Sequence, residues 1–255
     1  MFSTSTNNDR AIVIGGSGGV GRALVELLAK RGAKVLAVAS DIRDLKALQH
    51  DCELRYGSCI HVRATDLSAK DFNPELFTKE CAKTLDSVTH LFITVGAIST
   101  IDKGVPDANI VNELTTINYI RPAQLISSFC GHFLQNENGI GNVMVFTSIA
   151  TAAPRGNNVA YAAAKTSLEF YCLALQHFFS NSNIKIQVCS LGYVDTTMSF
   201  GLKLLFPTVS PQAVATYSLK LVRTKKRYAY YPRFWWLITK IIRLIPWHYY
   251  KKINF

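Results

Sequence analysis

The chain has 255 residues, of which 49% are hydrophobic and 18% are charged, and its formal net charge is +11. This composition excludes an intrinsically disordered chain, and the length suits one large α/β domain as well as two small ones. The charge is unevenly distributed, because no acidic residue follows Asp195 while lysines and arginines continue to the end. Such a basic tail predicts an anionic partner, either a membrane surface or a nucleic acid.

Cysteines and terminal segments indicate the compartment. The six cysteines lack CxxC spacing, which predicts free thiols in a reducing cytosol. The ligand-type residues His50, Cys52, Cys59 and His61 lie close together, but their spacing matches no zinc motif, so no metal site is expected. The first residues do not resemble a signal peptide, and no uncharged apolar run reaches the ~20 residues that span a bilayer. We expect a cytoplasmic protein, either soluble or peripheral on the cytoplasmic face of a membrane.

Apolar, β-branched runs alternate with helical patterns up to about residue 230. Nearly continuous apolar strands separated by helices are typical of a parallel sheet covered on both faces. The sequence predicts one doubly wound α/β domain over residues 10–231, after a flexible segment 1–9 and before a basic amphipathic extension 232–255. The predicted strands are Ala11–Ile14, Lys34–Ala39, Ile60–Ala64, His90–Val95, Asn142–Thr147, Ile184–Ser190 and Tyr228–Tyr230. The predicted helices are Gly21–Lys30, Leu45–Tyr56, Pro74–Leu85, Glu113–Leu134 and Val159–Phe179.

A glycine-rich turn, residues 15–21, follows the first strand and leads directly into a helix. Side chains there would keep the backbone amides away from a pyrophosphate, and the positive helix N-terminus attracts that anion. Two registers fit, G-x-G-x-x-G from Gly16 and G-x-x-x-G-x-G from Gly15, and the second is preferred because it starts where the strand ends. The residues predicted to bind a dinucleotide here are Gly15, Ser17, Gly19, Val20 and Gly21.

The end of the second strand bears on the choice between NADP and NAD. An acidic side chain at this place binds the ribose 2′-hydroxyl of NAD, but this strand is followed by Ser40. Ser40 can donate to a 2′-phosphate and Arg43 can neutralise it, which favours NADP over NAD. The alternative is that Ser40 and Asp41 only cap the next helix. After the third strand, Asp66 and Leu67 are expected to contact the adenine.

Three polar residues form a second candidate group. Ser148 ends a strand, and Tyr161 and Lys165 are four apart on a predicted helix, so both project from one face. An ammonium beside a phenol favours the phenolate, and lowering a tyrosine pKa from ~10 toward neutrality requires about 4 kcal/mol of stabilisation. Tyr161 can then exchange a proton with a carbonyl oxygen that Ser148 hydrogen-bonds. Each residue alone is a common coincidence, and only their combination with the glycine-rich turn predicts an oxidoreductase.

Over residues 10 to about 230 the chain resembles the short-chain dehydrogenase/reductase family, which has a Rossmann fold. The resemblance rests on the glycine-rich turn, on the spacing of Ser148 and Tyr161, and on the Y-x-x-x-K that ends at Lys165. It implies an NAD(P)-dependent oxidoreductase that transfers hydride between NADP(H) and a carbonyl or alcohol, with Tyr161 moving the proton. It also implies that Asn118 holds a water in a proton relay through the lysine. The implied catalytic residues are Asn118, Ser148, Tyr161 and Lys165.

The same resemblance assigns residues around the nicotinamide. Residues 191–196 resemble the family's P-G-x-V-x-T segment, so Val194 and Thr196 are expected to contact the nicotinamide amide, and Val95 and Gly96 are expected beside the cofactor. Three positions depart from the family pattern. The family's N-N-A-G is replaced by Ile93-Thr94-Val95-Gly96, a proline by Leu191, and a basic residue often found in NADP-specific members by Gly18. The four reactive positions are intact, so an active enzyme is expected, and the family implies a homo-oligomer such as a dimer.

Residues 198–207 are strongly apolar and correspond to the family's substrate lid. They predict a lipophilic ketone, aldehyde or acyl-chain carbonyl as substrate, unless the lid only packs on the body. Beyond them, Ser210 and Pro211 predict the start of a helix.

The C-terminal extension predicts an amphipathic helix over residues 233–246. Arg233, Lys240 and Arg243 gather on its polar side, which indicates a helix at a membrane surface. The alternative is a helix that packs on its own domain or across a dimer interface. The predicted apolar face consists of Phe234, Trp235, Ile238, Ile241, Ile242 and Ile245.

Two functions of another class remain open at this stage. The altered N-N-A-G segment allows a catalytically idle NADP-binding sensor or scaffold at a membrane surface. The basic tail allows a nucleic-acid-binding protein, but its cations stand among isoleucines and leucines, which suit lipid better than phosphates and bases. We therefore expect no nucleic acid as a partner.

Overall fold

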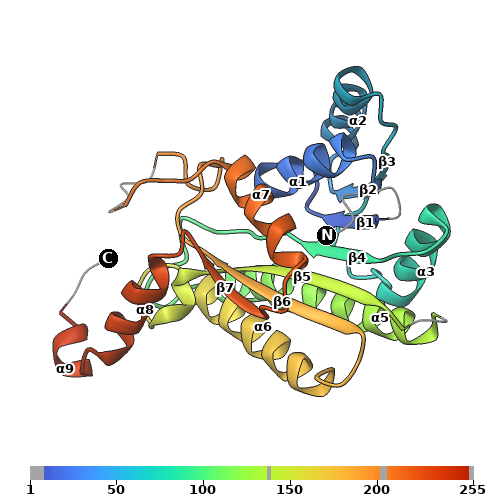
Figure 1. Ribbon diagram of the computed structural model, residues 1–255. Helices are drawn as coiled ribbons and strands as arrows, with labels where there is room; N and C mark the ends of the chain where they lie inside the picture. The colour runs from blue at the N-terminus through green and yellow to red at the C-terminus, as the bar shows by residue number, and fades with distance from the viewer. Residues whose placement is uncertain (1–8, 137–138, 202–205, 253–255) are drawn as a thin grey trace.

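The computed structural model describes residues 9–136, 139–201 and 206–252. These residues form a seven-stranded parallel sheet with helices on both faces (Figure 1). The strand order is β3-β2-β1-β4-β5-β6-β7, so the direction of winding reverses between β1 and β4. The predicted doubly wound fold is confirmed.

Each predicted strand is present, with small shifts at its ends. The strands are β1 (Arg10–Ile14), β2 (Lys34–Ala39), β3 (His61–Ala64), β4 (His90–Ile93), β5 (Gly141–Ser148), β6 (Ile184–Leu191) and β7 (Tyr228–Tyr231). The helices are α1 (Gly19–Lys30), α2 (Ile42–Tyr56), α3 (Pro74–Leu85), α4 (Ala108–Thr115), α5 (Arg121–Gln135), α6 (Val159–Phe178), α7 (Pro211–Val222), α8 (Trp235–Leu244) and α9 (Trp247–Tyr250), with a π-helix η1 (Thr116–Ile120) and a 3₁₀ turn η2 (Ile149–Ala152).

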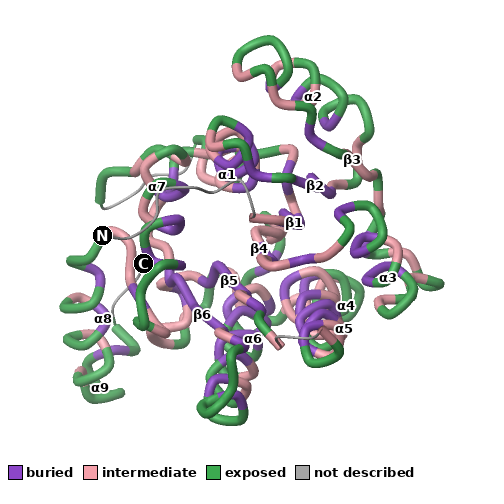
Figure 2. Tube along the Cα trace, turned by 45° about the vertical axis from the view of Figure 1, so that its right-hand side comes forward, coloured by how far each residue is buried: buried purple, intermediate pink, exposed green. Residues whose placement is uncertain are grey.

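The sheet separates two apolar cores. Ala11 and Val13 of β1 pack in one core with residues of α1, α2 and α7, whereas Ile12 and Ile14 pack in the other with residues of α3, α5 and α6. Figure 2 shows the strands largely buried and the outer faces of the helices exposed. Because the central strands are covered on both faces, they consist of nearly continuous apolar residues.

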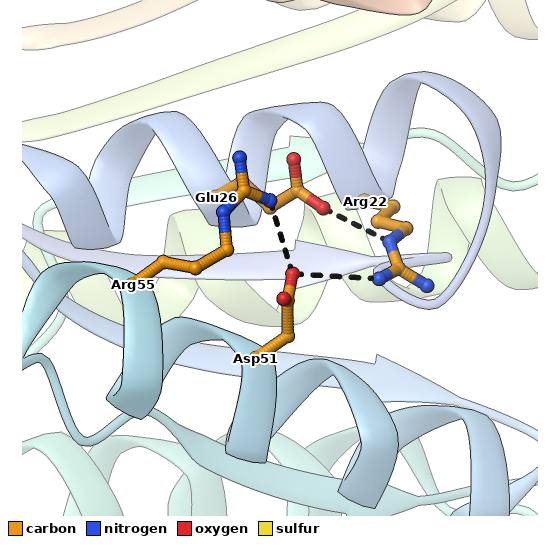
Figure 3. Close-up of polar contacts among 4 residues, drawn as sticks. All are labelled: Arg22, Glu26, Asp51 and Arg55. Atoms are coloured by element: carbon orange, nitrogen blue, oxygen red, sulfur yellow. Dashed lines mark hydrogen bonds and ion pairs between the residues drawn. The ribbon is translucent and has the colours of Figure 1, made fainter.

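A small ion-pair network joins α1 to α2 on the first of these faces (Figure 3). Arg22 of α1 lies 2.9 Å from Glu26 and 3.6 Å from Asp51 of α2, which also pairs with Arg55 at 3.2 Å. These side chains are partly exposed, so each pair adds no more than about 1 kcal/mol. The network therefore adds little to the stability of the fold.

The predicted helix over Glu113–Leu134 is interrupted. The chain passes from α4 through the π-helix η1 into α5, which has Pro122 in its first turn. Pro122 has no N–H to donate to the carbonyl four residues earlier, that of Asn118, and a π-turn accommodates such a gap. Within this π-helix, the Asn118 side chain donates to Leu114 O at 2.9 Å and to Ala97 O at 2.9 Å.

The predicted C-terminal helix is present as α8, followed by the short α9, and it packs against β7 and η2. Most of the predicted apolar face is turned toward the protein: Trp235 is buried, and Ile238, Ile242 and Ile245 are half-buried. The prediction that this face meets a membrane is therefore wrong for Trp235. Packing on the protein's own domain describes this residue and part of the surface of Ile238, Ile242 and Ile245. Among residues 9–136, 139–201 and 206–252, no helix is long and apolar enough to cross a bilayer.

Candidate active site

A cleft of about 520 Å³ opens at the carboxyl ends of strands β1 to β6. The glycine-rich turn lies on one side of it, and Ser148, Tyr161 and Lys165 lie on the other. The winding of the sheet reverses at this edge, where open α/β sheets bind their ligands.

The structure brings most of the predicted site residues to this cleft and leaves three outside its lining. Gly21 lies within α1, Arg43 lies on α2, and Asn118 is buried in η1. The predicted residues that line the cleft are Gly15, Ser17, Gly19, Val20, Ser40, Asp66, Leu67, Val95, Gly96, Ser148, Tyr161, Lys165, Val194 and Thr196.

The glycine-rich turn is closely packed at two of its glycines. A Cβ atom on Gly15, whose φ is +89°, would lie 2.7 Å from Thr94 Oγ1, and a Cβ atom on Gly21 would overlap the carbonyl oxygen of Gly15. At Gly18, by contrast, a Cβ atom would meet nothing within 4 Å. The geometry therefore fits the register that starts at Gly15, and Gly19 and Val20 at the start of α1 line the cleft.

Thr94 takes over part of the support that the altered N-N-A-G segment placed in question. Its Oγ1 donates to Ile14 O at 2.7 Å and lies 3.2 Å from Gly15 O, while its N–H donates to Ile14 O at 2.9 Å. The hydroxyl thus joins the end of β4 to the end of β1 and to the glycine-rich turn.

Ser40 and Arg43 have different surroundings. Ser40 lines the cleft, but the Arg43 side chain is 87% exposed and pairs with Asp41, Nη2 to Oδ2, at 2.6 Å. Asp41 also accepts from the Arg43 N–H at 2.8 Å as the N-cap of α2, and the hydrogen bonds from Arg43 lower its pKa to about 2. The capping alternative therefore describes Asp41 and not Ser40.

Two further parts of the wall are fixed by local hydrogen bonds. Asp66 accepts from the Ser68 N–H at 2.8 Å and from the Ser68 hydroxyl at 2.6 Å, which lowers the pKa of its carboxyl group. Arg121 donates to Leu67 O at 2.8 Å. Across the cleft, the Thr196 methyl group would lie 3.1 Å from a Cβ atom on Gly19, so the segment after β6 closes against the glycine-rich turn.

Ser148, Tyr161 and Lys165 form a polar group on the wall of the cleft, in which Lys165 is buried and the other two are half-buried. Burial raises the pKa of Tyr161, and a hydrogen bond from Ser148 together with the charge of Arg155 opposes this rise. Lys165 is 3% exposed, and burial lowers its pKa from 10.5 to about 8. The Tyr161 phenol, whose pKa is raised, thus lies one helical turn from the Lys165 ammonium, whose pKa is lowered.

Asn118 and Lys165 hold the same piece of backbone from two sides. Lys165 Nζ donates to Val95 O at 2.9 Å, while the fully buried Asn118 accepts from the Ala97 N–H at 3.1 Å and donates to Ala97 O. Both side chains therefore fix the segment after β4 that carries Val95 and Gly96.

Sequence reasoning missed two buried carboxylates beside this group. Asp102, fully buried, accepts from the Ala160 N–H at 2.9 Å and from the Tyr161 N–H at 3.0 Å, and so caps α6 from a distant loop. Glu169 accepts from Thr147 and Thr151, which flank Ser148, at 3.0 and 3.1 Å. Only Glu169 had a signal in the sequence, since it lies one further turn along the face of α6 that carries Tyr161 and Lys165.

A third residue that was missed belongs to the C-terminal extension. The Trp235 indole lies directly on Gly192, where a Cβ atom would overlap it, and packs edge-on against Tyr193 at a centroid distance of 5.6 Å. Phe206 lies against the other side of the indole at 4.9 Å. Trp235 thus supports the segment after β6 that lines the cleft.

Comparison with known proteins agrees with this geometry. The family model of the short chain dehydrogenases matches residues 9–203. Hydroxysteroid 11-beta-dehydrogenase 1-like protein B of Xenopus laevis is 23% identical over 253 residues, covering 97% of this chain and 85% of that protein.

Solved structures of low sequence identity share the fold. A short-chain dehydrogenase from Sphingobium yanoikuyae in complex with NADPH superposes with a TM-score of 0.79 at 19% identity, covering 96% of each chain. An alcohol dehydrogenase from Thermococcus sibiricus, complexed with 5-hydroxy-NADP, gives 0.73 at 18% identity, covering 87% of this chain and 95% of that one. With the family model matching most of its length, this chain belongs to the short-chain dehydrogenase/reductase family of oxidoreductases.

Proposed function

We propose that this protein binds NADP(H) and reduces a lipophilic ketone or aldehyde, with Tyr161 as the proton donor. The observation that carries the proposal is the placement of the glycine-rich turn and of Ser148, Tyr161 and Lys165 along one cleft of about 520 Å³. The walls suit a dinucleotide. Gly15 and Gly21 have no room for side chains, so a pyrophosphate can approach the positive end of α1.

The preference for NADP rests on the side chain that lines the cleft after β2. This residue is Ser40, and a hydroxyl can donate to a 2′-phosphate that a carboxylate would repel. Arg43 can add charge to the same phosphate only by leaving Asp41, so we assign it a secondary role. The two structural neighbours described above, solved with NADPH and with an NADP derivative, support the same choice.

The bound dinucleotide supplies the hydride, and the residues of this chain handle the proton. Because burial raises its pKa, the Tyr161 phenol keeps its proton at neutral pH and donates it to the carbonyl oxygen. Ser148 donates a hydrogen bond to the same oxygen as negative charge develops there. The Lys165 ammonium stabilises the phenolate that remains. Asn118 maintains the backbone beside the reacting atoms through its two hydrogen bonds with Ala97.

A lipophilic substrate fits the apolar part of the cleft. Ile98, Ile117, Tyr193 and Met198 line it together with Tyr161. An apolar ligand would displace water from these side chains, which stabilises its binding. The Xenopus relative is named for a hydroxysteroid, a substrate class of similar character.

A catalytically idle NADP-binding sensor remains the alternative, but the altered N-N-A-G segment is now a weaker argument for it. The substituted segment after β4 is supported by Thr94, and the four reactive positions are intact. NADPH consumption over a panel of apolar ketones and aldehydes separates the two readings. We expect turnover by the wild type and almost none by Tyr161→Phe. Binding of NADPH without turnover of any carbonyl would favour the sensor.

The cofactor is tested by titrating NADPH and NADH while following nicotinamide fluorescence. We expect tighter binding of NADPH by the wild type. Ser40→Asp places a carboxylate beside the 2′-phosphate, so NADPH affinity should fall at least about tenfold while NADH affinity is kept or improved. Ser40→Asn has a similar size without the charge and serves as the control. If neither nucleotide binds the wild type, the assignment of the cleft is wrong.

We further propose that the protein is a homo-oligomer, since α6 carries the exposed side chains Phe170 and Phe178. We also propose that it associates with the surface of a membrane, since α8 leaves apolar side chains exposed to solvent.

A further inference from the structure

The helix α8 has two apolar sides, and only one of them is covered. Trp235 and Thr239 are buried on the inner side, where Arg243 Nε also donates to Ala152 O at 3.3 Å. On the outer side, apolar side chains recur at positions 237, 241 and 244, the spacing of one helix face. We call this outer set, with its neighbours, the outward stripe. It consists of Trp236, Leu237, Ile241, Leu244 and Trp247, whose exposed fractions lie between 52% and 81%.

Cations border the outward stripe. Lys240 lies within it, with its Nζ 4.4 Å from the ring centroid of Trp236, and Lys251 and Lys252 are exposed just beyond α9. The sequence provides no carboxylate side chain after Asp195 to balance them. The apolar side chains can enter the acyl region of a lipid surface, and the cations can pair with anionic headgroups.

The same composition disfavours a second copy of the chain as the occupant. A two-fold interface is self-complementary, so the stripes of two copies would bring their lysines together. Like charges facing each other across an interface cost binding free energy. A lipid surface with anionic headgroups satisfies both the apolar side chains and the cations.

The start of α8 adjoins the segment that follows the cleft wall. Phe206 packs on Trp235 and on Phe234, with centroid distances of 4.9 and 6.0 Å, so the end of the lid segment meets the start of α8. In the same segment Phe200 is 88% exposed, and Met198 lines the cleft. In Figure 1 the described parts of this segment and α8 both lie toward the left of the molecule.

We propose that the outward stripe docks on an anionic lipid surface, with α8 lying in the plane of the membrane. Its buried side, through Trp235, holds the wall of the cleft, so docking places the opening of the cleft beside the lipid. This second consequence rests on the proposed function, because only a lipophilic substrate would enter from the membrane. The docking itself does not require it.

The test is co-sedimentation of the full chain with vesicles of phosphatidylcholine alone and with vesicles that also contain phosphatidylglycerol. We expect binding to the mixed vesicles that weakens with added NaCl, and little binding to the neutral ones. Leu237→Glu should weaken binding at least about tenfold. Leu76→Glu on α3 is the matched control, since both leucines are 55% exposed, and it should bind like the wild type. Lys251→Gln should weaken binding about fivefold.

Two outcomes of the co-sedimentation would overturn the docking. One is a wild type that fails to bind the mixed vesicles, and the other is equal loss of binding in Leu237→Glu and Leu76→Glu. If Leu237→Glu instead converts a dimer to a monomer in solution, a second copy covers the stripe and the lipid assignment is wrong. NADPH titration of each variant keeps this test separate from the proposed function. A wild type that binds NADPH but not the mixed vesicles overturns only the docking, and a wild type that binds the vesicles but not NADPH overturns only the cofactor assignment.

Discussion

Lys165 combines a proposed role in catalysis with an unfavourable effect on stability. Its ammonium is 3% exposed, and its pKa is lowered from 10.5 to about 8 by burial. Below pH 8 the folded state therefore holds a buried charge that the unfolded state leaves in water. The difference between the two pKa values corresponds to about 3 kcal/mol of destabilisation, which declines as the pH rises from 8 to 10.5 and the unfolded lysine also becomes neutral.

We therefore predict that Lys165→Met stabilises the protein while abolishing turnover. At pH 7 the free energy of unfolding should rise by about 2 kcal/mol, because the lost hydrogen bond to Val95 O offsets part of the gain. The gain should shrink between pH 8 and pH 10.5. Urea unfolding at several pH values measures it, and Lys30→Met, which removes an exposed lysine, should leave stability nearly unchanged. A destabilised Lys165→Met variant would contradict this account of the lysine.

At the level of elements, the helix that carries Tyr161 depends on a residue far away in the sequence. Asn158, at the N-cap of α6, has a left-handed backbone with φ of 56° and makes no capping hydrogen bond with its side chain. Asp102 replaces that cap, with both carboxylate oxygens on the first N–H groups of α6. The loop after β4 and the first turn of α6 are thereby locked together.

We predict that Asp102→Ala lowers both stability and turnover. Two buried N–H groups would lose their partners, which costs about 2–4 kcal/mol, and a displaced Tyr161 should lower kcat about tenfold to a hundredfold. The control is Asn73→Ala, which removes the cap of α3, where Asn73 accepts from two N–H groups at 3.0 Å. That variant should lose about 1 kcal/mol and keep its kcat. Full kcat in Asp102→Ala would show that the cap does not position the tyrosine.

The elements also show which patterns a sequence reveals. Buried strands and amphipathic helices have a local periodicity, so all seven strands and the start of α7 at Pro211 could be predicted. The π-helix η1 could not, because the break arises from Pro122 together with contacts between Asn118 and a loop twenty residues away. The face of α8 was misjudged for a related reason. The sequence shows an apolar face but not its tertiary partner, so it could not show that Trp235 is buried against the domain.

For the whole molecule, most of the predicted site residues lie beside strand ends, whereas Asn118, Tyr161 and Lys165 lie on helices. The carboxyl ends of parallel strands lie at one edge of the sheet. Once the strands were predicted, the glycine-rich turn, Ser40 and Ser148 could therefore be placed at the same edge. Two other residues that support the site had no signal in the sequence. Asp102 comes from an irregular loop, and Trp235 comes from an extension whose contact with Gly192 depends on how the chain returns after β7.

The proposed homo-oligomer would cover exposed apolar side chains of α6. Phe170 and Phe178 of α6 are each 74% exposed, and Leu173 between them is 39% exposed. Covering such side chains with a second copy removes apolar area from water, at about 25 cal/mol per Å². We expect the chain to run as a dimer in size exclusion with light scattering, and Phe170→Glu to shift it to the monomer.

Two variants show whether any such shift is specific to α6. Leu54→Glu on α2 changes a leucine that is 72% exposed, and Leu237→Glu changes the outward stripe of α8. Both should remain dimeric if α6 forms the interface. A monomeric wild type would contradict the proposed oligomer, and a dimer that only Leu237→Glu dissociates would move the interface to α8. Because the stripe cannot be covered by a second copy and by lipid at once, a dimer held through α6 is the assembly that leaves α8 free for a membrane.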